Sequence, residues 1–192
     1  IGQVSNILTI HCNELGYMNT YLSDRHGFNN DDSLWDKKIK NMLIGDSFIH
    51  GACVKNEKNI SNNLNSKNSN SLSLGLGGTG PLHQLAILKE YYHLVNPKNV
   101  IYFYYEDNDL KDLFKNKIDK NLKKYLNFNY HQKINLYQKE IDEFLINEFK
   151  KIIKKKVKTV NTEDEDKKNI FLKVIRFTEL RRFINFFLNE NF

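Results

Sequence analysis

The 192-residue chain is 40% hydrophobic and 27% charged, a balance typical of a globular domain rather than of a disordered segment. It contains no run of about 18 apolar residues, so the sequence predicts no transmembrane helix. The net charge is +6, but the excess is mainly lysine, concentrated in residues 115–124 and 150–158. Lysine-rich faces of solvated helices explain this excess better than nucleic-acid binding, which also uses arginine and aromatic residues.

The two cysteines, Cys12 and Cys53, lie far apart and form no CxxC motif. Their number and spacing match neither a zinc site nor a disulfide framework. We therefore expect Cys53 to be a small buried hydrophobic residue. No cofactor or metal is implied. The chain starts at Ile1 without a recognisable leader, so the sequence leaves the compartment open between cytoplasm and cell envelope.

The first expected elements surround a Gly-Asp-Ser sequence. Residues 21–35 are dense in Asp, Asn and Gly and predict a loop. A short buried strand is expected at residues 42–44, and it ends directly in Gly45-Asp46-Ser47. Helical segments follow, one of them at residues 58–64.

The middle of the chain repeats the order of strand, turn and helix. The glycine-rich turn at residues 75–80 follows a short strand around Leu72 and precedes a helix at residues 82–94, for which Pro81 is a suitable first residue. Residues 100–105 are nearly all β-formers, as expected of a buried parallel strand. Strands that alternate with helices in this way predict a doubly wound α/β sheet.

Helical periodicity dominates the rest of the chain. Apolar residues recur at helical spacing in residues 110–126, 130–156 and 170–188, with no strand pattern between them. We therefore expect a partial α/β domain at residues 1–113 and a helical insertion or subdomain at residues 114–192.

Three strand ends supply groups for one reaction. Ser47, the glycine turn and Asn108 each follow a strand, and in an open α/β sheet ligands bind at the carboxyl ends of the strands. A serine hydrolase needs an activated hydroxyl and N–H donors for the oxyanion that develops. Taken alone, Gly45-Asp46-Ser47 also fits an ordinary turn in which Ser47 caps a helix.

Together, the three segments resemble the first three sequence blocks of the SGNH/GDSL hydrolases. Gly45-Asp46-Ser47-Phe48 matches the first block, residues 75–81 the second and residues 106–110 the third, in the same order and at strand ends. Residues 24–30 resemble the lead-in segment of a bacterial branch, so the resemblance covers about residues 21–113. It implies a three-layer, flavodoxin-like parallel sheet. It also implies an esterase, lipase, deacetylase or O-acyltransferase that acts on ester or O-acetyl groups, those of carbohydrates included.

The resemblance implies a role for each matching position. Ser47 would be the nucleophile, with its own N–H in the oxyanion hole. The N–H of Gly78 and the side-chain amide of Asn108 would be the other two oxyanion donors, and Asp46 would brace the turn. Asp107 stands where the superfamily usually has glycine, and we expect its carboxylate to point outward.

The general base is missing from the match. The superfamily takes it from a histidine in an Asp-x-x-His motif near the carboxyl end, and none of the six histidines here stands in such a motif. We expect that histidine and the rest of the sheet beyond Phe192, which would leave this fragment by itself nearly inactive. His50, three residues after Ser47, is expected to be packed or solvated rather than to act as the base.

Other functions fit parts of the same pattern. Gly75-x-Gly77-x-x-Gly80, with Glu106 at the end of the next strand, matches the dinucleotide-binding pattern and would indicate an NAD(P)-binding domain. A relative that keeps the fold and binds carbohydrate without catalysis would explain the absent histidine. The expected partner is a small-molecule or carbohydrate ester, and the sequence does not predict an oligomeric state.

Overall fold

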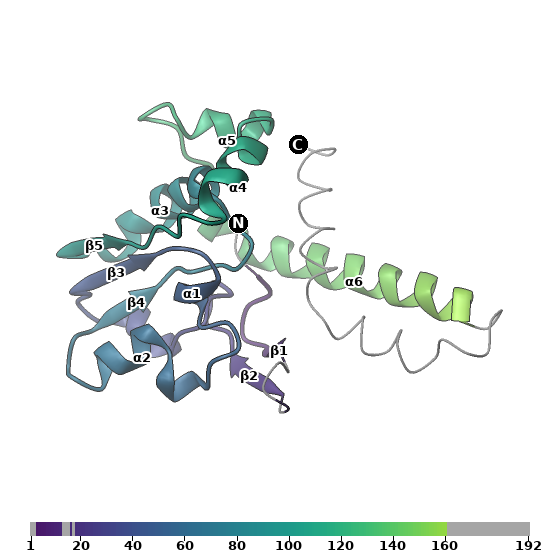
Figure 1. The fold of residues 1–192 in the computed structure, drawn as a ribbon, viewed down its shortest axis with the longest axis horizontal. Coiled ribbons are helices and arrows are strands. Elements are labelled where there is room, and N and C mark those ends of the chain that lie inside the picture. Colours follow the sequence, from purple (N-terminus) through teal and green to yellow (C-terminus); the bar gives the residue numbers. More distant parts are fainter. Residues whose placement is uncertain (1–2, 13–15, 17, 161–192) are drawn as a thin grey trace.

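A parallel sheet of three strands forms the centre of the molecule. The computed structural model describes residues 3–12, 16 and 18–160. The strands follow the order β4-β3-β5, and their bounds are Ser71–Ser73 for β4, Asn41–Ile44 for β3 and Asn99–Tyr102 for β5. Figure 1 shows β3 between its two neighbours. The mixed α/β architecture predicted from the alternation of strands and helices is thereby confirmed.

The connections between the strands are helical. β3 leads into α1 (Ser47–His50), the 3-10 helix η2 (Asn56–Lys58) and α2 (Ile60–Asn65). β4 leads through the glycine turn into α3 (Pro81–Val95). Helix α3 begins at Pro81, as predicted, because proline at the first helical position loses no intrahelical hydrogen bond.

A hairpin precedes the sheet. Strand β1 (Leu8–Cys12) pairs in antiparallel fashion with β2 (Asn19–Leu22), and the 3-10 helix η1 (Asp32–Asp36) follows. Between β2 and η1 the chain forms the predicted loop. Its centre is Asp24, a wholly buried carboxylate that accepts four hydrogen bonds. Burial raises the pKa of Asp24, and these four hydrogen bonds oppose that effect.

Beyond β5 the described chain consists of helices joined by loops. The segment expected as one helix at residues 110–126 forms two, α4 (Asp109–Asn116) and α5 (Lys120–Lys124). The 3-10 helix η3 (Ile134–Tyr137) then runs into the long helix α6 (Gln138–Val160), which Figure 1 shows extending away from the sheet. The helix predicted at residues 170–188 lies outside the described residues, and the division after residue 113 stays a prediction.

The main hydrophobic core lies between the sheet and α3. Side chains from β3, β4, α3 and the lead-in loop meet there, each almost without exposed surface: Met42, Ile44, Leu72, Leu74, Ile87, Tyr91 and Phe28. Burying side chains of this size stabilises the fold by about 1.5–3 kcal/mol each. This core fixes the positions of β3 and β4, and therefore of the turns that follow them.

Two predictions about the fold are wrong. The strand expected at residues 100–105 ends at Tyr102, and its side chains are half-exposed rather than buried: Val100 is 41% exposed and Ile101 is 38% exposed. The reason is its position, because within the described sheet β5 pairs only with β3 and forms an edge. The apolar run of residues 100–105 indicated β structure but could not indicate where in the sheet the strand lies.

The second wrong prediction concerns the cysteines. Cys12 and Cys53 form a disulfide with a Cα–Cα distance of 5.3 Å, so Cys53 is not a free buried residue. The bond joins the end of β1 to the turn after α1. Their 41-residue separation gave no sign of this pairing, which depends on the hairpin folding back onto that turn.

Candidate functional site

Ser47 lies just beyond the carboxyl end of β3, as the first residue of α1. The residue that caps this helix is Asp46, whose Oδ1 accepts a hydrogen bond from the N–H of Phe48 at 3.0 Å. The alternative in which Ser47 is the N-cap is therefore wrong. Ser47 is half-buried, and among the described residues neither its Oγ nor its N–H takes part in a hydrogen bond.

The glycine turn passes close to α1. The N–H of Leu76 donates to the carbonyl of Gly45 at 3.2 Å, which ties the turn to the end of β3. A Cβ at Gly75 would lie 2.3 Å from the backbone nitrogen of His50, so only glycine allows this approach. Gly78 is exposed with a φ of +78°, and its N–H has no hydrogen-bond partner in the described part of the chain.

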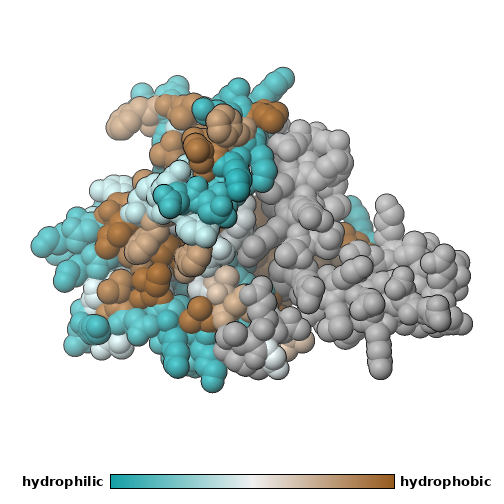
Figure 2. All heavy atoms as spheres, in the orientation of Figure 1, coloured by the Kyte–Doolittle hydropathy of each residue, from teal (hydrophilic) through white to brown (hydrophobic). Residues whose placement is uncertain are grey.

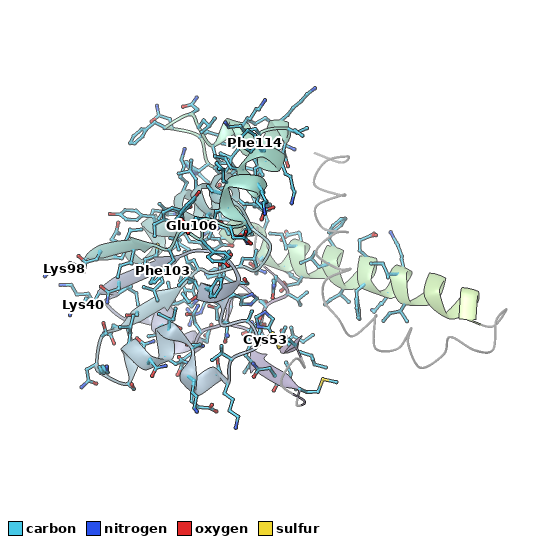
Figure 3. All side chains as sticks on the ribbon, in the orientation of Figure 1. Lys40, Cys53, Lys98, Phe103, Glu106 and Phe114 are labelled. Carbon is cyan, nitrogen blue, oxygen red and sulfur yellow. A yellow bond between two sulfur atoms is a disulfide. The ribbon has the colours of Figure 1, made fainter. Side chains whose placement is uncertain are left out.

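The segment after β5 reaches the same edge of the sheet. The N–H of Phe103 donates to the carbonyl of Ile44 at 2.8 Å, and the side-chain amide of Asn108 donates to Oδ2 of Asp46 at 3.0 Å. Figure 3 shows Phe103 and Glu106 along this segment, between β5 and α4. The amide of Asn108 is therefore fixed by Asp46, beside the start of α1, and does not contact the hydroxyl of Ser47 through a hydrogen bond.

Two residues that hold the segment after β5, Asp109 and Gln84, were not singled out from the sequence. Asp109 is wholly buried and accepts the N–H of Tyr105 at 2.7 Å and the side-chain amide of Gln84 at 3.4 Å. Burial raises the pKa of Asp109, and both hydrogen bonds oppose the rise. An aspartate in the first turn of a helix is common on an exposed surface too, so the sequence gave no sign of this role.

His50 is packed, as expected, and does not face Ser47 as a base. Its Nδ1 accepts the N–H of Gly77 at 3.2 Å, and its Nε2 lies 2.9 Å from the hydroxyl of Tyr21. Because Nδ1 accepts, Nε2 carries the proton and donates to Tyr21, whose hydroxyl in turn donates to Gln3 at 2.7 Å. The ring is 2% exposed and serves to join α1, the glycine turn and β2.

None of the other described histidines is hydrogen-bonded to Ser47. His83 is buried on α3, and burial lowers its pKa to about 3. Asp107 points outward as expected, since its side chain is 70% exposed and lies 3.5 Å from Nζ of Lys111.

Aromatic side chains flank the nucleophile position. Phe48 and Tyr105 are 57% and 41% exposed, and their ring centroids are 4.9 Å apart. Their contact joins α1 to the segment after β5 on the outside of the site. Figure 2 shows hydrophobic side chains gathered on this face across β3 and β5, between hydrophilic surfaces above and below.

In fold and site, the described chain is an α/β protein in which three strand ends meet at one edge of a parallel sheet. No family model, curated protein or solved structure matches it. Within residues 3–12, 16 and 18–160, no helix has the length and apolar character needed to cross a bilayer. The same residues contain no cluster of side chains suited to a metal ion.

Proposed function

We propose that the chain carries the nucleophile and the oxyanion hole of a serine hydrolase of the SGNH type, acting on ester or O-acetyl groups. The observation that supports this proposal most is that three polar groups near the end of β3 form no hydrogen bond within the described chain. The hydroxyl of Ser47 and the N–H groups of Ser47 and Gly78 have no hydrogen-bond partner among the described residues. Because Ser47 is half-buried and Gly78 is exposed, water reaches these groups in the free protein, and a ligand at this edge would take the place of that water.

In the proposed reaction, Oγ of Ser47 attacks the ester carbonyl carbon. The carbonyl oxygen becomes an oxyanion that accepts hydrogen bonds from the N–H groups of Ser47 and Gly78 and from the amide of Asn108. The alcohol leaves with a proton, and an acyl group stays on Ser47. Water then releases it as a carboxylic acid, whereas a second alcohol would make the protein an O-acyltransferase.

The general base belongs to the proposal as well. Both ring nitrogens of His50 are occupied by Gly77 and Tyr21, so this histidine cannot take the proton of Ser47 without breaking the packing of α1. All six histidines of the sequence lie in the described part of the chain and none is hydrogen-bonded to Ser47 there, so the proposed reaction needs a base other than these six. A serine hydroxyl without a base is a weak nucleophile, so residues 1–192 by themselves would have little activity.

Dinucleotide binding has weaker support. In that pattern the glycines allow a pyrophosphate to approach the backbone. Here Gly75 makes room for α1, and a Cβ at Gly80 would lie 2.6 Å from Oδ1 of Asn116 on α4. The N–H of Gly77 already donates to His50. The packing of neighbouring helices thus accounts for the glycine spacing without a cofactor.

Labelling with a fluorophosphonate tests the proposal, because this reagent reacts with activated serines. In the full-length protein we expect one label on the peptide that contains Ser47, located by mass spectrometry, and none in Ser47→Ala. Ser66→Ala removes an exposed serine at the end of α2 and should leave labelling unchanged. An unlabelled Ser47 in the full-length protein would favour a carbohydrate-binding protein without catalysis.

A further inference from the structure

Two neighbouring residues of α3 hold the loop of residues 125–136 against that helix. Nζ of Lys89 donates to the carbonyl of Tyr125 at 3.0 Å. Glu90 is wholly buried and accepts the hydroxyl of Tyr125 at 2.7 Å and the N–H of Ile134 at 2.9 Å. These bonds fix both ends of the loop, so the space between the loop and α3 is preformed rather than created by a ligand.

That space is a groove of about 540 Å³. Its size falls within the range of small-molecule sites, roughly 300–1,000 Å³. Most of its surface is apolar and comes from α3, β5 and the loop: Leu88, Tyr92, Val100, Phe128 and Leu136. An apolar chain or ring lying there would lose contact with water along most of its length.

The polar groups of the groove are basic or neutral. Lys89, Lys133, His93 and His131 contribute to the lining, and no carboxylate of the described residues does. Glu90, the buried carboxylate next to Lys89 on α3, directs its oxygens at Tyr125 and the loop backbone. An apolar floor with a basic rim is complementary to a ligand with an apolar body and a negative head.

We propose that this groove binds a hydrophobic monoanion, in which an aliphatic chain or an aromatic ring carries one carboxylate or sulfonate. The body lies along Leu88 and Val100, and the head lies beside Lys133 and His131. The groove follows the second half of α3 and the start of β5, at the end of the sheet away from Ser47. The proposal is therefore independent of the proposed hydrolase activity.

Isothermal titration of the full chain with decanoate, below its micelle concentration, tests the proposal. Decanol and decyltrimethylammonium serve as neutral and cationic ligands with the same apolar chain. We expect saturable one-to-one binding of decanoate, about five-fold tighter than that of decanol, since the exposed ammonium group of Lys133 contributes modestly. The cationic ligand should bind more weakly than decanol.

Two leucines provide matched variants, because Leu136 and Leu126 are each 67% exposed and only Leu136 lines the groove. Leu136→Glu should abolish decanoate binding, and Leu126→Glu should leave it intact. Lys133→Gln combined with His131→Gln should bring the affinity for decanoate down to that for decanol. Absence of saturable binding, equal affinity for all three ligands, or equal loss in both leucine variants would overturn the proposal.

Discussion

The side-chain amide of Asn108 donates to Oδ2 of Asp46 at 3.0 Å, while Oδ1 of the same carboxylate accepts the N–H of Phe48. One aspartate thus caps the helix that begins with Ser47 and holds the third strand-end segment beside it. This carboxylate therefore couples two of the proposed oxyanion donors, the N–H of Ser47 and the side-chain amide of Asn108. A change at Asp46 should therefore affect both stability and the reactivity of Ser47.

Asp46→Ala removes the cap and releases Asn108. We expect the free energy of unfolding to fall by about 1–2 kcal/mol, as for other lost N-caps, and fluorophosphonate labelling of Ser47 to slow strongly. Asp119→Ala is a matched control, because Asp119 caps α5 by accepting the N–H groups of Asn121 and Leu122. It should cost a similar amount of stability in urea unfolding without changing the labelling rate. Equal labelling rates in both variants would refute the coupling.

Gly75 gives a steric prediction. In Gly75→Ala the new methyl group would lie 2.3 Å from the backbone nitrogen of His50 and 2.4 Å from the carbonyl carbon of Ile49. Overpacking of this kind costs about 1–3 kcal/mol, and here it must move α1 or the glycine turn. We expect lower stability in urea and slower labelling of Ser47.

Gly16→Ala is the control for this substitution. Gly16 has a φ of +79°, and among the described residues no atom lies within 4 Å of an added Cβ, so the expected cost of alanine there is backbone strain of about 1 kcal/mol. It should leave the labelling of Ser47 unchanged. Wild-type stability and labelling in Gly75→Ala would show that the turn does not approach α1 as closely as described.

The disulfide between Cys12 and Cys53 predicts sensitivity to reductant. It closes a loop with a sequence separation of 41, which by chain entropy corresponds to roughly 4 kcal/mol of stability. Dithiothreitol should therefore lower the midpoint of urea unfolding of the wild-type chain. The double variant Cys12→Ser, Cys53→Ser should unfold at the lower midpoint with or without reductant. A wild-type unfolding midpoint that does not change with reductant would contradict the disulfide between Cys12 and Cys53.

The sequence predicted the elements of the site better than their contacts. The strand before Gly45 and the helix that starts at Pro81 follow from local signals, namely an apolar run bounded by glycine and a proline at a helix start. The bonds of Asp46 to Asn108 and of His50 to Gly77 join residues far apart in the chain. No local pattern encodes them, because they depend on how parallel strands are ordered.

Edge position and disulfide pairing escaped prediction for the same reason. The β-forming residues of β5 are compatible with a central strand and with an edge strand, and only the order of strands in the sheet shows which of the two it is. Cys12 meets Cys53 because the hairpin of β1 and β2 folds back toward α1. Each of these features is a consequence of tertiary structure rather than of a segment's own composition.

His83 predicts how stability depends on pH. Burial lowers the pKa of this histidine from its ordinary value of 6.5 to about 3, so the folded state keeps the ring neutral where the unfolded state takes up a proton. The contribution of His83 to stability is therefore full at high pH and is lost as the pH falls below about 6.5, by up to about 1.4 kcal/mol per pH unit. The raised pKa of the buried Asp24 acts in the opposite direction at acidic pH, so the total curve alone does not isolate His83.

A comparison with His83→Gln isolates the contribution of this histidine, because glutamine does not titrate and Asp24 is present in both proteins. Urea unfolding measured from about pH 8 to about pH 4 should give a wild-type stability that falls more steeply than that of the variant. The two curves should converge, or cross, toward acidic pH. Parallel curves over this range would mean that His83 is protonated equally in the folded and unfolded states, and that its environment is more polar than its burial on α3 implies.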